Sequence, residues 1–167
     1  GDDIIIGGAG DDNIDGGDGA DQINGGDGND MLDGGNGADT FTTGDGDDTV
    51  VISIVYDDGI GGPSGTVFSF SDSGLGSARD TILDFSEAGI DGGDKISLVD
   101  SGHTSGQGVV DFDFIGTNSF TQTGAEVRYT IIQGNAIVEI DADGDGASDL
   151  SIQVNDTDVL GANDFIL

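Results

Sequence analysis

The chain has 167 residues and a formal net charge of −31 at pH 7, from 34 acidic and 3 basic residues. This excess of negative charge excludes nucleic acid and anionic membrane surfaces as partners, because both would repel it. The sequence has no cysteine, so disulfides and thiolate zinc sites are also excluded. No apolar run is long enough to span a bilayer.

The first 51 residues repeat a nine-residue pattern, G-G-x-G-x-D-x-U-x, in which U is a large apolar residue. Four copies follow one another from 7 to 42, and a degenerate fifth spans 43–51 with Thr43 in place of the first glycine. Residues 1–6 supply the last six positions of an earlier copy, so we expect further repeats upstream. The sixth position is always aspartate: Asp3, Asp12, Asp21, Asp30, Asp39 and Asp48.

This pattern is similar to the calcium-binding nonapeptide repeat of the RTX proteins. The resemblance implies a parallel β-roll whose turns bind calcium through the sixth-position aspartates and through main-chain carbonyls of glycines. The glycines expected to contribute carbonyls occupy the second and fourth positions: Gly8, Gly10, Gly17, Gly19, Gly26, Gly28, Gly35, Gly37, Gly44 and Gly46.

The spacing of the repeat agrees with this fold. Each x-U-x triplet makes a short strand with one inward side chain, and the six residues before it reverse the chain. Two repeats complete one coil, so residues eighteen apart stack about 4.8 Å from each other. Two calcium–oxygen bonds of about 2.3–2.6 Å span that gap. Aspartate pairs from Asp3–Asp21 to Asp30–Asp48 therefore predict about four ions. The two predicted stacks of inward residues are Ile5, Ile23 and Phe41, and Ile14, Leu32 and Val50.

Without the metal we expect the repeats to be disordered. Each repeat buries a single apolar side chain, and stacked carboxylates about 5 Å apart repel each other by roughly 3 kcal/mol at an effective dielectric constant of 20. A divalent cation turns this repulsion into attraction. The alternative is a metal-free disordered linker, but a linker would not hold an apolar residue in strict nine-residue register.

After Val51 the period of nine ends and aromatic residues appear. We therefore expect an all-β chain in two parts: a parallel β-roll of calcium-binding repeats over 1–51, and an antiparallel β cap over 52–167 that covers the open end of the roll. Within the cap, 58–65 is expected to be a loop and His103 a solvated loop residue. Apolar–polar alternation predicts cap strands within 50–56, 66–71, 80–85, 94–99, 110–115, 126–133, 135–140 and 149–154.

The stretch DADGDGASD, residues 141–149, is a second candidate metal site. Its carboxylates at positions one, three, five and nine match the start of an EF-hand loop, but position twelve is Ile152 where glutamate is expected, so a complete EF-hand is excluded. Two interpretations remain: a tight Asp-Gly hairpin, or one more calcium ion. Asp84 and Asp94 are further candidate ligands near the junction of roll and cap. The ligands of the additional ion would be Asp141, Asp143, Asp145 and Asp149.

The second half, in 80–100, 112–131 and 141–167, is similar to the carboxy-terminal domain of serralysin-type metalloproteases and related RTX exoproteins. The resemblance implies an extracellular protein of a Gram-negative bacterium, exported by a type I secretion apparatus. It also implies an uncleaved carboxy-terminal signal, an acid followed by three apolar residues. Here these residues are Asp164, Phe165, Ile166 and Leu167.

We therefore expect a non-catalytic calcium-binding module that folds on calcium binding outside the cell and carries the type I secretion signal of a larger exoprotein. The chain has one histidine and no HExxH motif, so we expect no catalysis here. An enzyme, such as a metalloprotease, is expected as an upstream domain of the same parent chain. The alternative is a polysaccharide- or surface-binding module of an extracellular enzyme similar to alginate epimerases, or of an adhesin.

Overall fold

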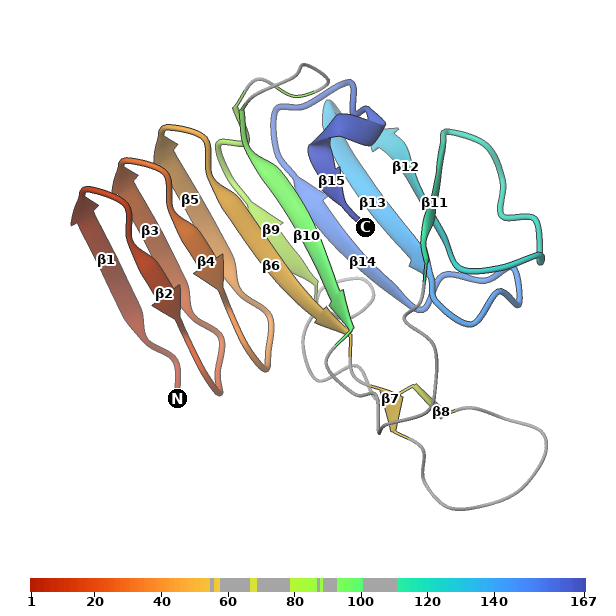
Figure 1. The fold of residues 1–167 in the computed structure, drawn as a ribbon, viewed down its shortest axis with the longest axis horizontal. Helices are drawn as coiled ribbons and strands as arrows, with labels where there is room; N and C mark the ends of the chain where they lie inside the picture. The colour runs from red at the N-terminus through yellow and green to blue at the C-terminus, as the bar shows by residue number, and fades with distance from the viewer. Residues whose placement is uncertain (55, 58–66, 69–78, 87, 89–92, 101–110) are drawn as a thin grey trace.

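The computed structural model describes residues 1–54, 56–57, 67–68, 79–86, 88, 93–100 and 111–167. The repeats wind into a flattened coil with one strand on each side (Figure 1). Neighbouring strands on each side are parallel, and their residues pair at a separation of eighteen. One side holds β1 (Ile4–Ala9), β3 (Gln22–Asp27) and β5 (Thr40–Asp45), and the other holds β2 (Asn13–Asp15), β4 (Met31–Asp33) and β6 (Thr49–Ile54).

The stacking of inward residues follows the predicted order. Ile5 lies opposite Ile23, and Ile23 lies opposite Phe41. On the other side Leu32 lies between Ile14 and Val50. Leu32, Phe41 and Val50 are completely buried. The predicted parallel β-roll is therefore confirmed.

Glycine is required near the end of β3 and in the turn after it, because the coils approach each other closely there. Gly26 and Gly28 have φ values of +114° and +132°, which favour glycine over any other residue. A Cβ at Gly26 would collide with the carbonyl oxygen of Gly8, and one at Gly28 would lie 2.6 Å from the carbonyl oxygen of Gly10. The sequence can therefore stack these turns only by omitting side chains.

The roll continues for one coil beyond the repeats. Strand β9 (Asp80–Ile82) pairs in parallel with β5, and β10 (Lys95–Asp100) pairs in parallel with β6. We expected these two strands within an antiparallel cap, and their parallel pairing corrects that detail. These two strands resemble those of the repeats. β9 begins with Asp80 and β10 follows Asp94, and each presents one inward isoleucine, although the spacing is no longer eighteen.

The rest of the chain forms an antiparallel meander that extends one sheet of the roll. Strands β12 (Glu126–Ile132), β13 (Asn135–Asp141) and β14 (Leu150–Val154) pair antiparallel in sequence, and β14 joins β9 in parallel. The confirmed fold class is thus an all-β chain with a parallel roll and an antiparallel part.

Four shorter strands and one short helix complete the description. Strand β11 pairs in parallel with β12, and β15 pairs in parallel with β10 after a short 3₁₀ helix, η2. Strands β7 and β8 form a separate two-stranded ladder. Their bounds are β7 (Tyr56–Asp57), β8 (Val67–Phe68), β11 (Asp113–Gly116), η2 (Ala162–Asp164) and β15 (Phe165–Ile166).

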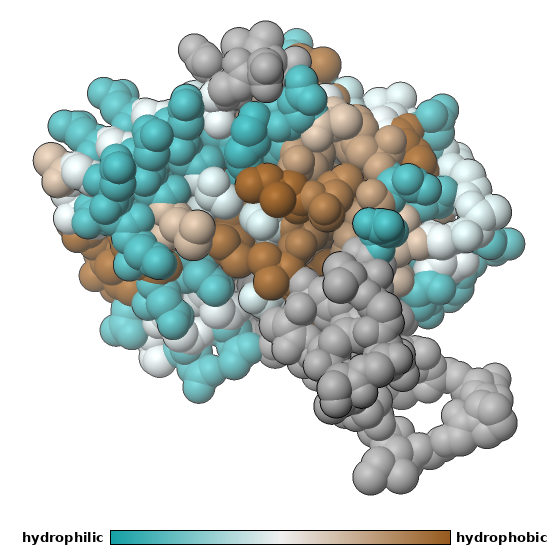
Figure 2. Space-filling model, viewed as in Figure 1, coloured by the Kyte–Doolittle hydropathy of each residue, from teal (hydrophilic) through white to brown (hydrophobic). Residues whose placement is uncertain are grey.

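Two sheets enclose one hydrophobic core that runs from the roll into the cap. The larger sheet has the order β1-β3-β5-β9-β14-β13-β12-β11, and the smaller has the order β15-β10-β6-β4-β2. Figure 2 shows polar residues over the roll and a hydrophobic area near the middle of the molecule. In the part of the chain that the structure describes, no helix has the length and apolarity needed to cross a bilayer.

The expected boundary between the two parts lies at 51/52 and remains a prediction. Strand β6 crosses this position, and both sheets continue across the junction of roll and cap. The expected loop at 58–65 and His103 lie outside the described residues.

Candidate metal centre

The sixth-position aspartates form a ladder along each edge of the roll. In each of the four predicted pairs, the backbone N–H of one aspartate donates to Oδ1 of the aspartate eighteen residues later. The donor–acceptor distances are 2.7 Å for Asp3–Asp21, 2.8 Å for Asp12–Asp30, 2.7 Å for Asp21–Asp39 and 2.8 Å for Asp30–Asp48.

The ladder extends past the repeats. The N–H of Asp39 donates to Oδ1 of Asp80 at 2.8 Å, and the N–H of Asp48 donates to Oδ1 of Asp94 at 3.1 Å. Asp80 and Asp94 therefore stand where the sixth-position aspartates of two further repeats would stand. The sequence predicts Asp94 as a candidate ligand but not Asp80, because the chain before Asp80 departs from the period of nine.

The second carboxylate oxygens of these ladders are the unusual feature of the molecule. Oδ2 is buried and accepts no hydrogen bond in five repeat aspartates. A buried carboxylate oxygen without a donor is costly, because it has lost its water and gained no partner. A bound cation would satisfy such an oxygen. The five residues are Asp12, Asp21, Asp30, Asp39 and Asp48.

In Asp12, Asp21 and Asp30 this oxygen lies beside a main-chain carbonyl of the next coil. A Cβ on Gly7 would lie 2.7 Å from Oδ2 of Asp12 and 2.5 Å from the carbonyl oxygen of Gly25. The absence of a side chain at the first position of the repeat therefore leaves room where two oxygens converge. Carbonyls were expected from the second and fourth positions and not from the first, although the invariant first glycine of the four complete repeats was the available signal.

The same arrangement occurs on the opposite edge of the roll. A Cβ on Gly16 would lie 2.7 Å from Oδ2 of Asp21 and 2.7 Å from the carbonyl oxygen of Gly34. The donor set on both edges thus consists of carboxylate and carbonyl oxygens. Calcium prefers such hard oxygen ligands, so the residues present fit this ion.

Of the second- and fourth-position glycines, Gly8, Gly26 and Gly44 lie near the ends of β1, β3 and β5, and the others lie between the strands. Both positions have positive φ in all five repeats. At least one of their carbonyls has a backbone partner, since Gly17 accepts the N–H of Asn36 at 2.7 Å. Their role as calcium ligands remains a prediction.

Residues 1–32 and 24–51 match the family of RTX calcium-binding nonapeptide repeats, in four copies. The first 51 residues form an RTX β-roll. Among solved structures, the chain is similar to the AlgE6R3 subunit of the Azotobacter vinelandii mannuronan C5-epimerase, with 27% identity, a TM-score of 0.55, and coverage of 99% of this chain and 78% of that one. The AlgE6R2 subunit of the same epimerase shares the fold, with 23% identity, a TM-score of 0.57 and coverage of 99% and 87%. No curated protein matches the chain.

Two sixth-position aspartates of the RTX roll have raised pKa values. Burial raises the pKa of Asp48 to about 6, and the negative charges of Asp94, Asp30 and Asp84 add to the increase. Burial is also the main cause of a raised pKa at Asp39. Burial and neighbouring carboxylates thus oppose negative charge at these two positions.

The last turn of the RTX roll is closed by hydrogen bonds within the protein. Thr43 replaces the first glycine of the fifth repeat, and its hydroxyl lies 2.9 Å from Oδ2 of Asp94 and 3.1 Å from Oδ1 of Asp84. The N–H of Ser86 also donates to Oδ2 of Asp94, at 2.7 Å. Unlike Oδ2 of Asp48, therefore, both oxygens of Asp94 have partners from the protein.

The 141–149 stretch connects β13 to β14. Ligand oxygens of Asp141, Asp143 and Asp149 lie within 4.8 Å of one another, whereas Asp145 is not part of this group. Asp141 is buried and accepts the N–H groups of Gly144 at 2.7 Å and Gly146 at 2.8 Å. Burial is the largest cause of the raised pKa of both Asp141 and Asp149. The turn is thus built by its own hydrogen bonds, and calcium at this turn remains a prediction.

Proposed function

We propose that this chain is a non-catalytic module that folds when calcium fills the turns of the roll outside the cell. The observation that supports the proposal best is the set of five repeat aspartates whose buried Oδ2 atoms accept no hydrogen bond. Each belongs to a stack in which the neighbouring carboxylate is one coil away. Folding without a cation would therefore bury like charges against one another.

The two carboxylate oxygens of the ladder aspartates have different roles, and only one of them needs the ion. The Oδ1 atoms hold the coils in register through backbone N–H groups. The Oδ2 atoms of Asp12, Asp21 and Asp30 lie beside the carbonyls of the first position. Calcium supplies the positive charge that this oxygen cluster lacks. Each site filled at one hundred times its Kd stabilises the folded state by about 2.7 kcal/mol. About four such sites would contribute roughly 11 kcal/mol, which is comparable to the whole stability of a domain.

Far-UV circular dichroism tests this proposal. In EDTA at physiological salt, we expect little β signal from the roll, and calcium addition should restore it in a cooperative transition. Magnesium at the same concentration is the control, because it demands octahedral geometry and keeps several waters. A strong β signal in EDTA that calcium does not change would refute calcium-triggered folding.

We also propose that the carboxy terminus carries a type I secretion signal. In the folded chain, Asp164 is completely buried and accepts the N–H of Gly161 at 2.8 Å, and Phe165 lies 5.0 Å from the ring of Phe114. Ile166 and Leu167 remain 50% and 40% exposed. These last two side chains can therefore be changed without disturbing the core.

An export assay separates the signal from the fold. Replacing Ile166 and Leu167 with serine should abolish export through a type I apparatus while calcium-dependent folding is retained. The control is Ile132→Ser on β12, because the Ile132 side chain is similarly exposed, at 55%. Equal export of both variants would refute the signal.

The similarity to subunits of a mannuronan C5-epimerase favours a second function, the binding of polysaccharide. Such a module would hold an extracellular enzyme or adhesin on its substrate or surface. Five bound calcium ions would reduce the formal charge of the protein from −31 to about −21. An acidic polysaccharide would therefore still be repelled unless calcium bridged it to the protein. Calorimetric titration with alginate in calcium tests this function, and heat equal to the buffer blank would count against alginate as the ligand.

A further inference from the structure

The outer face of the larger sheet has two adjacent rows of residues without charge, and the Arg128–Glu139 ion pair lies in the next row on β12 and β13. The two rows cross seven strands from β1 to β12, at right angles to the strands, and all their side chains except the buried Ile137 are at least partly exposed. In the roll, one row contains Gln22 and Thr40 and the other contains Asn24 and Thr42. We call the two rows together the neutral stripe. Its members are Ile4, Gln22, Thr40, Thr81, Gln153, Ile137, Thr130, Ile6, Asn24, Thr42, Leu83, Asn155, Asn135 and Ile132.

The absence of charge at these positions is unusual for this molecule, which has 34 acidic residues. The outer face of the smaller sheet follows the same nonapeptide register, yet it carries Asp15 and Asp33 at ninth positions and Lys95 on β10. The ninth positions of the larger sheet hold Ile6, Asn24 and Thr42 instead. The two faces of the roll therefore differ in charge although they have the same fold.

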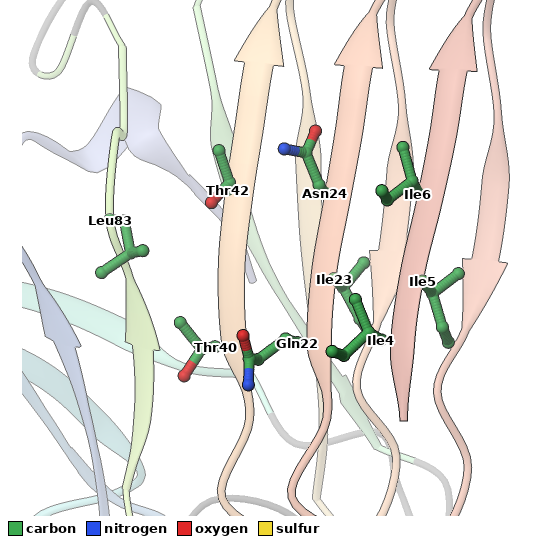
Figure 3. A pocket seen from close by; sticks show the side chains of 9 residues that line it. All are labelled: Ile4, Ile5, Ile6, Gln22, Ile23, Asn24, Thr40, Thr42 and Leu83. Carbon is green, nitrogen blue, oxygen red and sulfur yellow. The ribbon is translucent and has the colours of Figure 1, made fainter. Parts of the chain in front are cut away.

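The roll end of the neutral stripe is hollowed into a groove. Figure 3 shows the side chains of one row, Ile4, Gln22 and Thr40, separated from those of Ile6, Asn24 and Thr42 in the other. The groove has a volume of about 210 Å³ and ends at Leu83. Gln22 and Asn24 are exposed, so their amide groups are available to a ligand.

We propose that the neutral stripe binds an uncharged polysaccharide that lies across the strands. Amide and hydroxyl side chains can donate and accept hydrogen bonds with sugar hydroxyls. The exposed apolar side chains can contact the apolar faces of sugar rings; these are Ile4, Ile6, Leu83 and Ile132. Seven strands about 4.8 Å apart give the stripe a length of about 29 Å, enough for several sugar units.

The charge of the molecule favours a neutral polysaccharide over the other possible ligands. An acidic polysaccharide would be repelled by the aspartate-rich turns that border the stripe, and a basic peptide would be attracted to those turns and not to the stripe. A second copy of the chain would bring two strongly negative molecules together through a largely polar surface. The proposal takes from the second function above only the class of ligand, and it requires the roll to be folded.

Calorimetric titration of the full chain in calcium, with laminarin, cellohexaose and dextran as probes, tests the proposal. We expect heat above the buffer blank for at least one neutral glucan. Asn24→Asp should weaken that binding by about tenfold or more, because it places an unpaired carboxylate in the groove. The matched control is Asn13→Asp, an exposed position on the smaller sheet, which should change the affinity less than about twofold.

Circular dichroism in calcium should first show that both variants fold as the wild type does. Three results would then overturn the inference. No heat with any of the three glucans would exclude the neutral stripe as a glycan site. Binding of alginate alone would preserve the polysaccharide function but refute a neutral ligand. A dimer in sedimentation analysis that Asn24→Asp dissociates and Asn13→Asp does not would assign the stripe to a second copy of the chain.

Discussion

Replacing Asp30 with asparagine should have opposite effects in the presence and absence of calcium. Asp30 stands in the middle of the stack Asp12–Asp30–Asp48, so it belongs to two predicted calcium pairs. Asparagine can still accept the N–H of Asp12 with its carbonyl oxygen, and its own N–H can still donate to Asp48. The substitution therefore removes the charge and one ligand oxygen but leaves the register of the coils intact.

The size of the stability change follows from the number of aspartate pairs that contain Asp30. Losing two sites that are each filled at one hundred times Kd should cost about 5 kcal/mol of calcium-dependent stability. In EDTA the sign reverses, since the change removes two repulsions of roughly 3 kcal/mol each at an effective dielectric constant of 20, before screening by salt. The Asp30→Asn substitution should therefore favour the metal-free fold and weaken the calcium-bound one.

Two titrations followed by circular dichroism measure these effects. Calcium titration should show a much higher midpoint for Asp30→Asn than for the wild type. In EDTA, less of a folding osmolyte such as trimethylamine oxide should be needed to induce β structure. Asp27→Asn is the control, because it removes the same charge from an exposed position of the same repeat. Equal calcium midpoints for the two variants, or a greater need for osmolyte in Asp30→Asn, would refute the proposed role of the ladder.

Three further predictions concern the turns. Gly34→Ala should lower the free energy of unfolding in calcium by about 1–3 kcal/mol, because its Cβ would lie 2.7 Å from the carboxylate carbon of Asp39. The control is Gly124→Ala, whose Cβ would meet nothing within 4 Å and should leave the melting temperature unchanged. Thr43→Val should cost about 1–3 kcal/mol by removing the buried hydroxyl that partners two carboxylates, while Thr42→Val, half-buried next to it, should change the melting temperature little. The pKa of about 6 at Asp48, raised from 3.8, means that protonation stabilises the metal-free fold fully below pH 3.8 and that this stability is lost as the pH rises through 6. Protons should compete with calcium there, so the calcium midpoint should rise as the pH falls below about 6, and a midpoint independent of pH would contradict this.

The roll was predictable from the sequence because its two determinants have the same period. Every nine residues bring one inward apolar side chain and one aspartate, so the register of Ile23 opposite Phe41 follows from counting. Most of the cap strands were also predictable from apolar–polar alternation, for example β13 from the stretch 135–140. These signals are local, and local patterns can be read from a single sequence.

The extra coil was not predictable, because its pairing depends on contacts across 41 and 46 residues. Asp80 follows an arginine, and no complete glycine-rich turn precedes it in nine-residue register. Only the three-dimensional ladder shows that it occupies a sixth position. The first-position carbonyls were missed for a different reason: a main-chain oxygen leaves no mark in the sequence except the lack of a side chain beside it.

The extra coil also bears on the order in which the roll can form. At the junction, Oδ2 of Asp94 is bonded by Thr43 and Ser86, so this turn satisfies its carboxylate from the protein alone. In the repeats, Oδ2 of the aspartates has no such partner. On the side of β6 and β10, the cap end can thus present the satisfied carboxylate of Asp94 to the last repeat, whereas each earlier coil adds an unsatisfied oxygen. Assembly from the cap toward Gly1 therefore avoids the unfavourable nucleus that an isolated pair of repeats would have to form, since each filled site would complete a coil on an edge that already exists.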